Sequence, residues 1–180
     1  MLDFWFGAPG SPERGRPRKL WFQKSEPFDA EVRRRFLATW ERTARGECEC
    51  WQATPLASLA LIVVLDQFPR NMFRGTARSF ASDSLALAAA RETTARGFDL
   101  LLSPVERLFV YLPFEHAEDL AAQRRSLALC HARDPEDMQY AKRHYEIIAR
   151  FGRFPHRNAI LGRQSTAEES EFLKQPGSSF

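Results

Sequence analysis

Arginine and asparagine gather in two short segments, 65–71 and 150–158, at points where a helical pattern stops, and the second segment adds a histidine. The candidate ligand-binding residues in and beside these segments are Asp66, Arg70, Asn71, Arg74, Arg153, His156, Arg157 and Asn158. The planar guanidinium fork matches a carboxylate or a phosphate. Helix ends also carry backbone groups that lack partners within the helix. These residues therefore predict a site for a small anionic molecule or an acidic peptide end.

A third segment, 111–119, supplies acids and one further histidine. Glu115 and His116 are the candidate catalytic residues, because an imidazole with a pKa near 6.5 exchanges protons at neutral pH and a carboxylate can set its charge. Glu118 joins the predicted ligand-binding set. Consecutive helical residues point about 100 degrees apart, so Glu115 need not face His116. The alternative is a buried histidine whose hydrogen bonds are satisfied by a carbonyl or an acid.

The same charged residues have a purely structural interpretation. Asp66 and Arg70 can pair with each other or with adjacent helices, and a charged hydrogen bond contributes about 1.5 to 3 kcal/mol. The basic residues of 150–158 can neutralise the acids of 111–119 and fix the register of the helices. A structure in which every guanidinium group is paired with protein would argue against a ligand pocket. If the helix continues past Pro69, then Arg70, Arg74 and Arg78 share one face.

Several kinds of chemistry have no motif in this chain. No Glu-x-x-His pair and no His-Glu-x-x-His occur, so we predict no metal site. Nucleophile elbows, phosphate loops and dinucleotide fingerprints are also absent, so we predict no cofactor. The three cysteines are too few for a disulfide framework. We interpret them as ordinary thiols, and redox or metal chemistry at Cys48-x-Cys50 is the alternative.

Composition restricts the class of protein. With 180 residues and 44% hydrophobic residues, the chain is long enough for one ordinary domain, residues 1–180. The net charge is +3, and 22 of the 26 basic residues are arginine, but acids and bases alternate along most helical patterns. We therefore predict no nucleic-acid partner. The longest apolar run, Leu59–Leu65, is too short to cross a bilayer, and Asp3 lies where a secretory signal carries basic residues. A cytoplasmic location with no membrane partner is expected.

Periodicity predicts helices throughout and no convincing strand. Phe28, Val32, Phe36 and Trp40 recur every four residues, and the four tryptophans, Trp51 included, are expected in the core. The predicted helices are a short N-terminal one before a loop at 8–18, then 27–44, 55–68, 83–96, 104–112, 118–131, one from Asp134-Pro135 to 151, and a short one to 173 capped by Ser165 or Thr166. Since Pro69 disfavours a helical conformation at Phe68, an end or a kink is expected there. This order predicts an all-α domain of antiparallel helical hairpins.

Ordered motifs along the whole chain carry a resemblance to a known family. They include the opening Leu-Asp-Phe-Trp-Phe-Gly, Leu-Asp-Gln-Phe-Pro-Arg-Asn at 65–71, Tyr-Leu-Pro-Phe-Glu-His at 111–116 and Arg-Phe-Gly-Arg-Phe-Pro-His-Arg-Asn at 150–158. With these motifs the chain resembles the bacterial TPR-like family called domain of unknown function 924. The resemblance implies stacked helix pairs similar to tetratricopeptide repeats and implies no established reaction. Members usually carry a few more residues before the first motif, so Met1 is a candidate late start, and the loop at 9–18 is unusually rich in proline, glycine and arginine.

Three functions remain open from the sequence. The first is a binding module in which the three polar segments line one groove. Its contacts are Arg70, Arg153 and Arg157, and its orienting donors are His116, His156 and Asn158. The second is a cofactor-independent hydrolase or isomerase that uses His116 or Glu115 as general acid–base, with the arginines stabilising negative charge. The third is a scaffold that binds a protein partner on its concave face. The oligomeric state does not follow from the residues.

Overall fold

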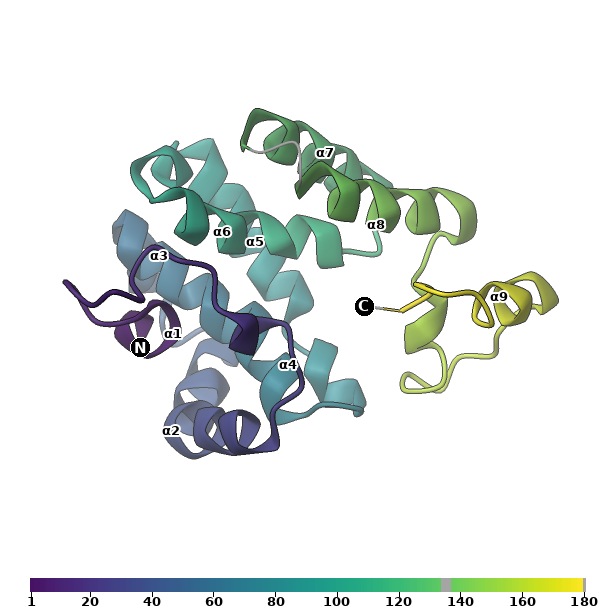
Figure 1. The fold of residues 1–180 in the computed structure, drawn as a ribbon, viewed down its shortest axis with the longest axis horizontal. Helices are drawn as coiled ribbons and strands as arrows, with labels where there is room; N and C mark the ends of the chain where they lie inside the picture. Colours follow the sequence, from purple (N-terminus) through teal and green to yellow (C-terminus); the bar gives the residue numbers. More distant parts are fainter. Residues whose placement is uncertain (134–136, 180) are drawn as a thin grey trace. The chain divides into compact units, whose positions relative to one another are not determined.

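The computed structural model describes residues 1–133 and 137–179, and the described chain is all-helical (Figure 1). The α-helices are α1 (Leu2–Phe6), α2 (Glu26–Ala44), α3 (Pro55–Ile62), α4 (Phe68–Met72), α5 (Asp83–Ala95), α6 (Pro104–His116), α7 (Leu120–Arg133), α8 (Asp137–Phe151) and α9 (Ala167–Phe172). Short 3₁₀ turns occur at Lys19–Trp21, Glu49–Ala53, Ala77–Phe80, Phe98–Leu101 and Pro155–Arg157, and a π-helical turn at Val63–Gln67. No strand occurs in the described residues, so the all-α prediction is confirmed.

The chain divides into two compact units. The first unit comprises Met1–Arg74 and Arg78–Pro113, and the second comprises Gly75–Ala77 and the described residues from Phe114 onward. Each unit is described by itself below. The expectation of a single domain over residues 1–180 stays a prediction.

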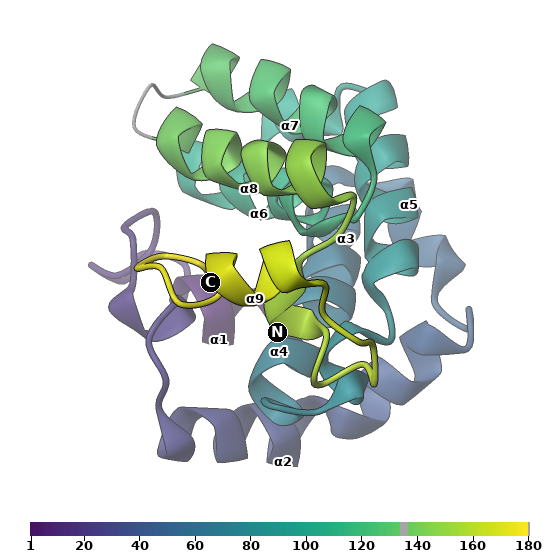
Figure 2. The ribbon, with the colours of Figure 1, turned by 90° about the vertical axis from the view of Figure 1, so that its right-hand side faces the viewer.

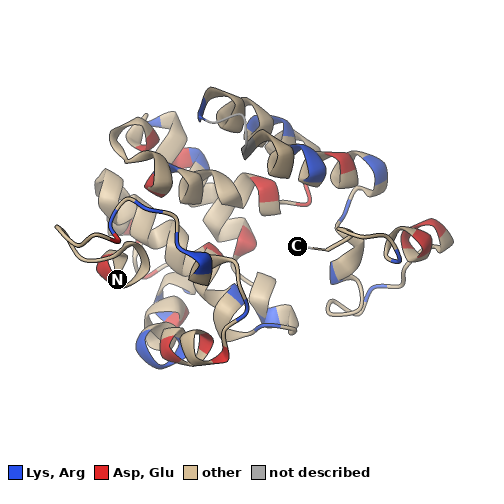
Figure 3. Cartoon of the chain, in the orientation of Figure 1, with Lys and Arg blue, Asp and Glu red and all other residues tan. Residues whose placement is uncertain are grey.

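In the first unit, α2 follows the predicted period of four residues. Val32, Phe36 and Trp40 are buried, and the rest of the helix carries arginines among Asp and Glu (Figure 3). Gly46 follows the end of the helix with φ of +80°, a backbone conformation that glycine adopts without a steric cost. Trp5 and Trp21 are buried together against Phe109, while Trp51 is only partly buried, because it lies on a 3₁₀ turn rather than on a packed helix.

The central apolar segment stays helical past Pro69. The expected irregularity at Phe68 takes the form of the π-helical turn, after which α4 continues to Met72. Because Pro69 has no N–H group, the carbonyl of Leu65 loses the donor that an α-helix would supply. The hydroxyl of Ser82 donates to this carbonyl over 2.6 Å, and the indole N–H of Trp40 donates to Ser82 Oγ over 2.9 Å. Side chains of α2 and the α5 N-terminus thus complete the hydrogen bonding of the broken helix.

One conditional prediction for this segment is wrong. Because α4 ends at Met72, Arg74 lies beyond the helix and Arg78 lies on the 3₁₀ turn Ala77–Phe80. Arg70, Arg74 and Arg78 therefore do not share one helical face. The physical reason is that Phe73 leaves the helical conformation, with φ of −126° and ψ of 28°.

The second unit is built on an antiparallel hairpin of α7 and α8, which lie side by side in both views (Figures 1 and 2). The helix α7 begins at Leu120 rather than at 118, because the carboxylate of Asp119 accepts a hydrogen bond from the N–H of Ala122 and caps the helix. The predicted start of α8 at Asp134-Pro135 lies outside the described residues. Gly152, with φ of +69°, follows the end of α8 and turns the chain into the segment 153–158.

Two helix ends position candidate residues. The helix α6 continues through Pro113 to His116, beyond the predicted end at 112, so Glu115 and His116 lie on its last turn. At the other end of the unit, Thr166 and Glu169 form a capping box for α9, which confirms Thr166 as the cap. Among the described residues, no helix is long and apolar enough to span a membrane.

Candidate functional site

The predicted site residues fall in both units. Asp66, Arg70, Asn71 and Arg74 belong to the first unit, and the remaining candidates belong to the second. The second group comprises Glu115, His116, Glu118, Arg153, His156, Arg157 and Asn158. The convergence of the two groups on one groove stays a prediction.

In the first unit, Arg70 is held between two carboxylates. Its Nη1 and Nη2 donate to Asp83 over 2.8 and 3.0 Å, and Nη1 also donates to the backbone carbonyl of Asp66 over 2.6 Å. Asp66 is fully buried, with a carboxylate oxygen 3.3 Å from the same Nη1. Burial opposes the charged form, but Asp66 and Asp83 outweigh it and raise the pKa of Arg70. Arg70 therefore acts as a structural tie, meaning a charged side chain whose hydrogen bonds to a carboxylate hold two elements together, here α4 and α5.

A second tie joins α2 to the segment after α4. Arg74 donates to both carboxylate oxygens of Asp29, with Nε and Nη2 at 2.9 and 3.0 Å. The amide of Asn71 donates to the same carboxylate over 2.7 Å. The structural interpretation, in which these residues pair with adjacent helices, therefore describes the first unit. The sequence did not single out the acids Asp29 and Asp83 as partners.

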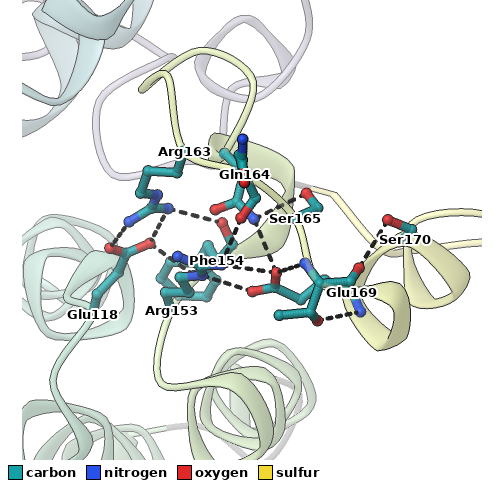
Figure 4. Close-up of polar contacts among 10 residues, drawn as sticks. Glu118, Arg153, Phe154, Arg163, Gln164, Ser165, Glu169 and Ser170 are labelled. Carbon is teal, nitrogen blue, oxygen red and sulfur yellow. Dashed lines mark hydrogen bonds and ion pairs between the residues drawn. The ribbon is translucent and has the colours of Figure 1, made fainter.

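In the second unit, Arg153 is also committed to a carboxylate (Figure 4). Its Nε and Nη2 donate to Glu169 over 2.7 and 2.9 Å, and Nη2 donates to the carbonyl of Gln164. Asn158 donates to the same carboxylate and to Ser165 Oγ, over 3.3 and 3.1 Å. The hydrogen bond from Arg153 lowers the pKa of Glu169 to about 2. This arrangement fastens α9 to the segment after α8.

Glu118 makes a related contact with Arg163, a residue that the sequence analysis did not select. Its carboxylate accepts from Arg163 Nη1 and Nη2 over 2.6 and 2.9 Å and from the N–H of Phe154 over 2.7 Å (Figure 4). Burial opposes ionisation, yet the hydrogen bonds from Arg163 and Phe154 prevail and lower the pKa of Glu118. Glu118 therefore holds the chain at the start of the segment 154–158.

A different arrangement surrounds the fully buried ring of Phe154. We call it the Phe154 cluster, and its members are His116, His144, Phe154, His156 and Arg157. The rings of His144 and His156 each lie 5.6 Å from that of Phe154, and the Arg157 guanidinium stands over the same ring at 4.6 Å. The His116 ring is 6.3 Å from that of His144, and its carbonyl accepts from Arg157 Nη2 over 3.1 Å. Three imidazoles and one guanidinium thus share one small volume.

The imidazole that faces Glu115 is His144. Glu115 Oε2 lies 3.8 Å from His144 Nδ1, which is also 2.8 Å from the carbonyl of Tyr140. Burial lowers the pKa of His144 to about 3, so the ring is neutral at pH 7 and its Nδ1–H donates to Tyr140. The sequence analysis missed His144, although it stands three residues after Ala141 and four before Ile148 on the apolar stripe of α8. That spacing marks it as inward-facing.

The cysteines take no part in a metal centre within the described residues. Cys48 and Cys130 are buried and Cys50 is exposed, all as free thiols. Burial raises the pKa of Cys130 to about 12, and its Sγ–H donates to Glu115 Oε1 over 3.4 Å. Where the chain is described, no three His, Cys, Asp or Glu side chains are grouped so as to hold a metal ion.

Comparisons with known proteins agree with the motifs. The family model described as "Bacterial protein of unknown function (DUF924)" matches residues 1–177. The chain is also similar to a solved structure, a protein of unknown function, ATU0120, from Agrobacterium tumefaciens. The two share 46% identity with a TM-score of 0.83, over 86% of this chain and 88% of that one. No curated protein matches the chain.

Proposed function

Because this chain belongs to the bacterial DUF924 family, whose function is unknown, we propose a function from its own side chains: it binds a small anionic ligand, and Arg157, His116 and His156 are the donors. The observation that carries this proposal is the gathering of Arg157 and three imidazoles around Phe154. The guanidinium groups of the sequence hypothesis all have protein partners, which argues against a pocket lined by unpaired arginines. Arg70, Arg74 and Arg153 each donate two hydrogen bonds to one carboxylate and so serve structure, and Arg157 donates to the His116 carbonyl. The proposal therefore depends on the grouping of imidazoles with Arg157 and not on an arginine without a partner.

The positive charge of Arg157 favours an anion at this place. Burial is the main reason why the pKa of His156 falls to about 4, and the positive charge of Arg157 is the next. Burial disfavours a charge of either sign, so the Arg157 charge is the part of this effect that stabilises a negative charge. A guanidinium beside imidazole donors is also the chemistry that holds a carboxylate or phosphate.

The test is a thermal-shift screen of carboxylates and phosphates against the full chain. A ligand at one hundred times its dissociation constant stabilises the folded state by about 2.7 kcal/mol, which appears as a higher melting temperature. We expect Arg157→Lys to abolish the shift, because one ammonium cannot replace the fork. Arg150→Lys is the matched control, since Arg150 is exposed and paired with Glu168. A panel without any shift, or a shift that survives in Arg157→Lys, would reject the proposal.

A cofactor-independent acid–base enzyme is the second candidate. The observation that favours it is the Glu115 carboxylate facing the His144 imidazole at 3.8 Å, beside His116. Because the Nδ1–H of His144 donates to Tyr140, the proton-exchanging groups of this candidate are Glu115 and His116. If a metabolite screen finds turnover, then Glu115→Gln and His116→Asn should each remove it while the fold persists. Turnover that is unchanged in both variants would exclude these residues as acid–base groups.

The finer architectural expectation is also a proposal. We propose that the helical hairpins stack as in tetratricopeptide repeats, which the antiparallel pair α7 and α8 supports. A cytoplasmic location rests on the sequence alone.

A scaffold role would require that binding of a protein partner depends on exposed apolar residues. Leu100 and Leu101 on a 3₁₀ turn are two such residues. Capture that persists in a Leu100→Ser, Leu101→Ser variant would reject a role for that turn.

A further inference from the structure

Charged side chains of both signs stand beside the Phe154 cluster. Arg157 is buried within it, and the Glu118 carboxylate, whose pKa is lowered, pairs with Arg163 next to Phe154. The Glu118–Arg163 pair is about a quarter exposed, and Glu115 is buried. An anion that enters this volume therefore brings a negative charge near Glu118 into a poorly hydrated place. Such a charge is costly unless a positive charge accompanies it.

The imidazoles are the side chains here that can supply that positive charge near neutral pH. His156 is the best placed of them, because it lies on the 3₁₀ turn Pro155–Arg157 and is only partly buried, so a proton from solvent can reach it. The groups that face it are Arg157 on its own turn, His116 on α6, Glu118 before α7, and Arg163 in the segment before α9. His144 on α8 packs edge-on against the Phe154 ring and is more deeply buried.

We propose that the Phe154 cluster binds its anion together with one proton, which His156 takes up from solvent. This inference rests on the proposed function and specifies its chemistry. The balance is one anion and one proton from solution, which join the neutral imidazole to form an imidazolium–anion pair beside Arg157. No bond to carbon forms or breaks, and no electron is transferred. Binding is therefore favoured in mildly acidic solution.

The rise in the pKa of His156 on anion binding determines the pH range in which proton uptake can be measured. Burial and Arg157 hold the pKa of His156 at about 4 in the chain without ligand. If the anion binds the protonated form about 10 to 100 times more tightly, linkage raises this pKa by roughly one to two units. Proton uptake is therefore measurable between about pH 4 and pH 6 and is small at about pH 7.5.

Sulfate is a suitable probe, because it does not itself titrate in this pH range. We would follow the imidazole carbon-bound protons by NMR over a pH titration, with sulfate and with sodium chloride at equal ionic strength. The pKa of His156 should rise by about one unit or more in sulfate. The exposed His131 on α7 is the internal control. In His156→Gln, sulfate binding should persist but lose its dependence on pH between about pH 4 and 6.

The NMR titration distinguishes failure of proton uptake from failure of anion binding. Sulfate that perturbs resonances of the Phe154 cluster without moving the His156 titration overturns proton uptake and leaves anion binding intact. Sulfate, phosphate and acetate that leave every resonance of the cluster unchanged at all pH values overturn the proposed function as well. If His156→Gln does not fold, the titration of the unmodified chain decides the question by itself.

Discussion

The cluster around Arg70 in the first unit and the Phe154 cluster in the second both cover basic side chains, but with different partners. Arg70 meets the carboxylate of Asp83 through two parallel hydrogen bonds. The imidazoles of the Phe154 cluster meet an aromatic ring, a backbone carbonyl and one another, and the Glu115 carboxylate lies 3.8 Å from His144. A guanidinium–carboxylate pair keeps its charge across the physiological range, whereas a buried imidazole changes charge with its surroundings. The residues around Arg70 therefore serve stability, whereas the Phe154 cluster is the place where we propose exchange of an anion and a proton.

The largest expected effect is loss of stability in mild acid. Burial holds the pKa of His144 at about 3 and that of His156 at about 4, below the ordinary value near 6.5. Between these values the unfolded chain binds more protons, so the free energy of unfolding falls as the pH drops from about 6.5 to about 4. We expect a loss of about 6 kcal/mol for the two groups together, measured by urea unfolding at several pH values.

The double variant His144→Gln, His156→Gln removes both titrating rings and should flatten this dependence. The Arg70 cluster contributes nothing in the same window through its guanidinium, whose pKa is raised. An unchanged pH profile in the double variant would show that the two clusters do not differ in the proposed way.

The second-largest expected effect is the loss of stability when the guanidinium group of Arg70 is removed. Arg70→Ala leaves the buried carboxylate of Asp66 without its neighbouring guanidinium, so the free energy of unfolding should fall by about 3 kcal/mol. Arg34→Ala is the control, because Arg34 pairs with Glu31 on the exposed face of α2 and should leave stability unchanged. Equal urea midpoints for Arg70→Ala and wild type would mean that the pair with Asp83 is not a structural tie.

A smaller effect is expected where Arg153 binds Glu169. Glu169→Gln removes the charge that two arginine nitrogens contact, and stability should fall by about 2 kcal/mol. The neighbouring Glu168→Gln is the matched control, since Glu168 is exposed and its partner Arg150 is half exposed. Thermal unfolding of the two variants compares them directly. Similar melting temperatures would contradict the assignment of Arg153 to structure and return it to the ligand-binding candidates.

The smallest effect concerns the π-helical turn beside Arg70. Ser82→Ala removes the hydroxyl that donates to the Leu65 carbonyl, and the free energy of unfolding should fall by about 1 kcal/mol. Ser84→Ala, exposed on the same helix α5, is the control. If the two serine variants unfold at the same urea concentration, the carbonyl freed by Pro69 does not depend on Ser82.

The comparison also shows what could be predicted at each site. The spacing of Val32, Phe36 and Trp40 predicted α2, and the Thr166–Glu169 spacing predicted the cap of α9, because both signals depend on residues within one or two turns. Pro69 predicted an irregularity at Phe68, but not that it would be a π-helical turn. The π-turn persists because Ser82, seventeen residues after Leu65, supplies the missing donor. The continuation of α6 to His116 was missed for a related reason, since a proline inside a helix is tolerated only where packing compensates for it.

The sequence was least able to predict which acidic residue each arginine or histidine contacts. Arg74 contacts Asp29 across 45 residues, and Arg163 contacts Glu118 across the same separation. No spacing rule connects residues so far apart, because their distance depends on how helices pack. His144 was available from the period of α8, but a histidine among apolar residues did not by itself indicate a facing carboxylate.

By itself, the sequence determined that the chain is helical, where most helices begin and end, and which ordered motifs place it in its family, because helix periodicity, capping and turns are local properties. Which arginines bind carboxylates, as Arg70, Arg74 and Arg153 do, and that Arg157 lies among imidazoles became known only from the tertiary structure. Charge pairing depends on which side chains packing brings within about 4 Å, and burial then decides which of them keep their charge.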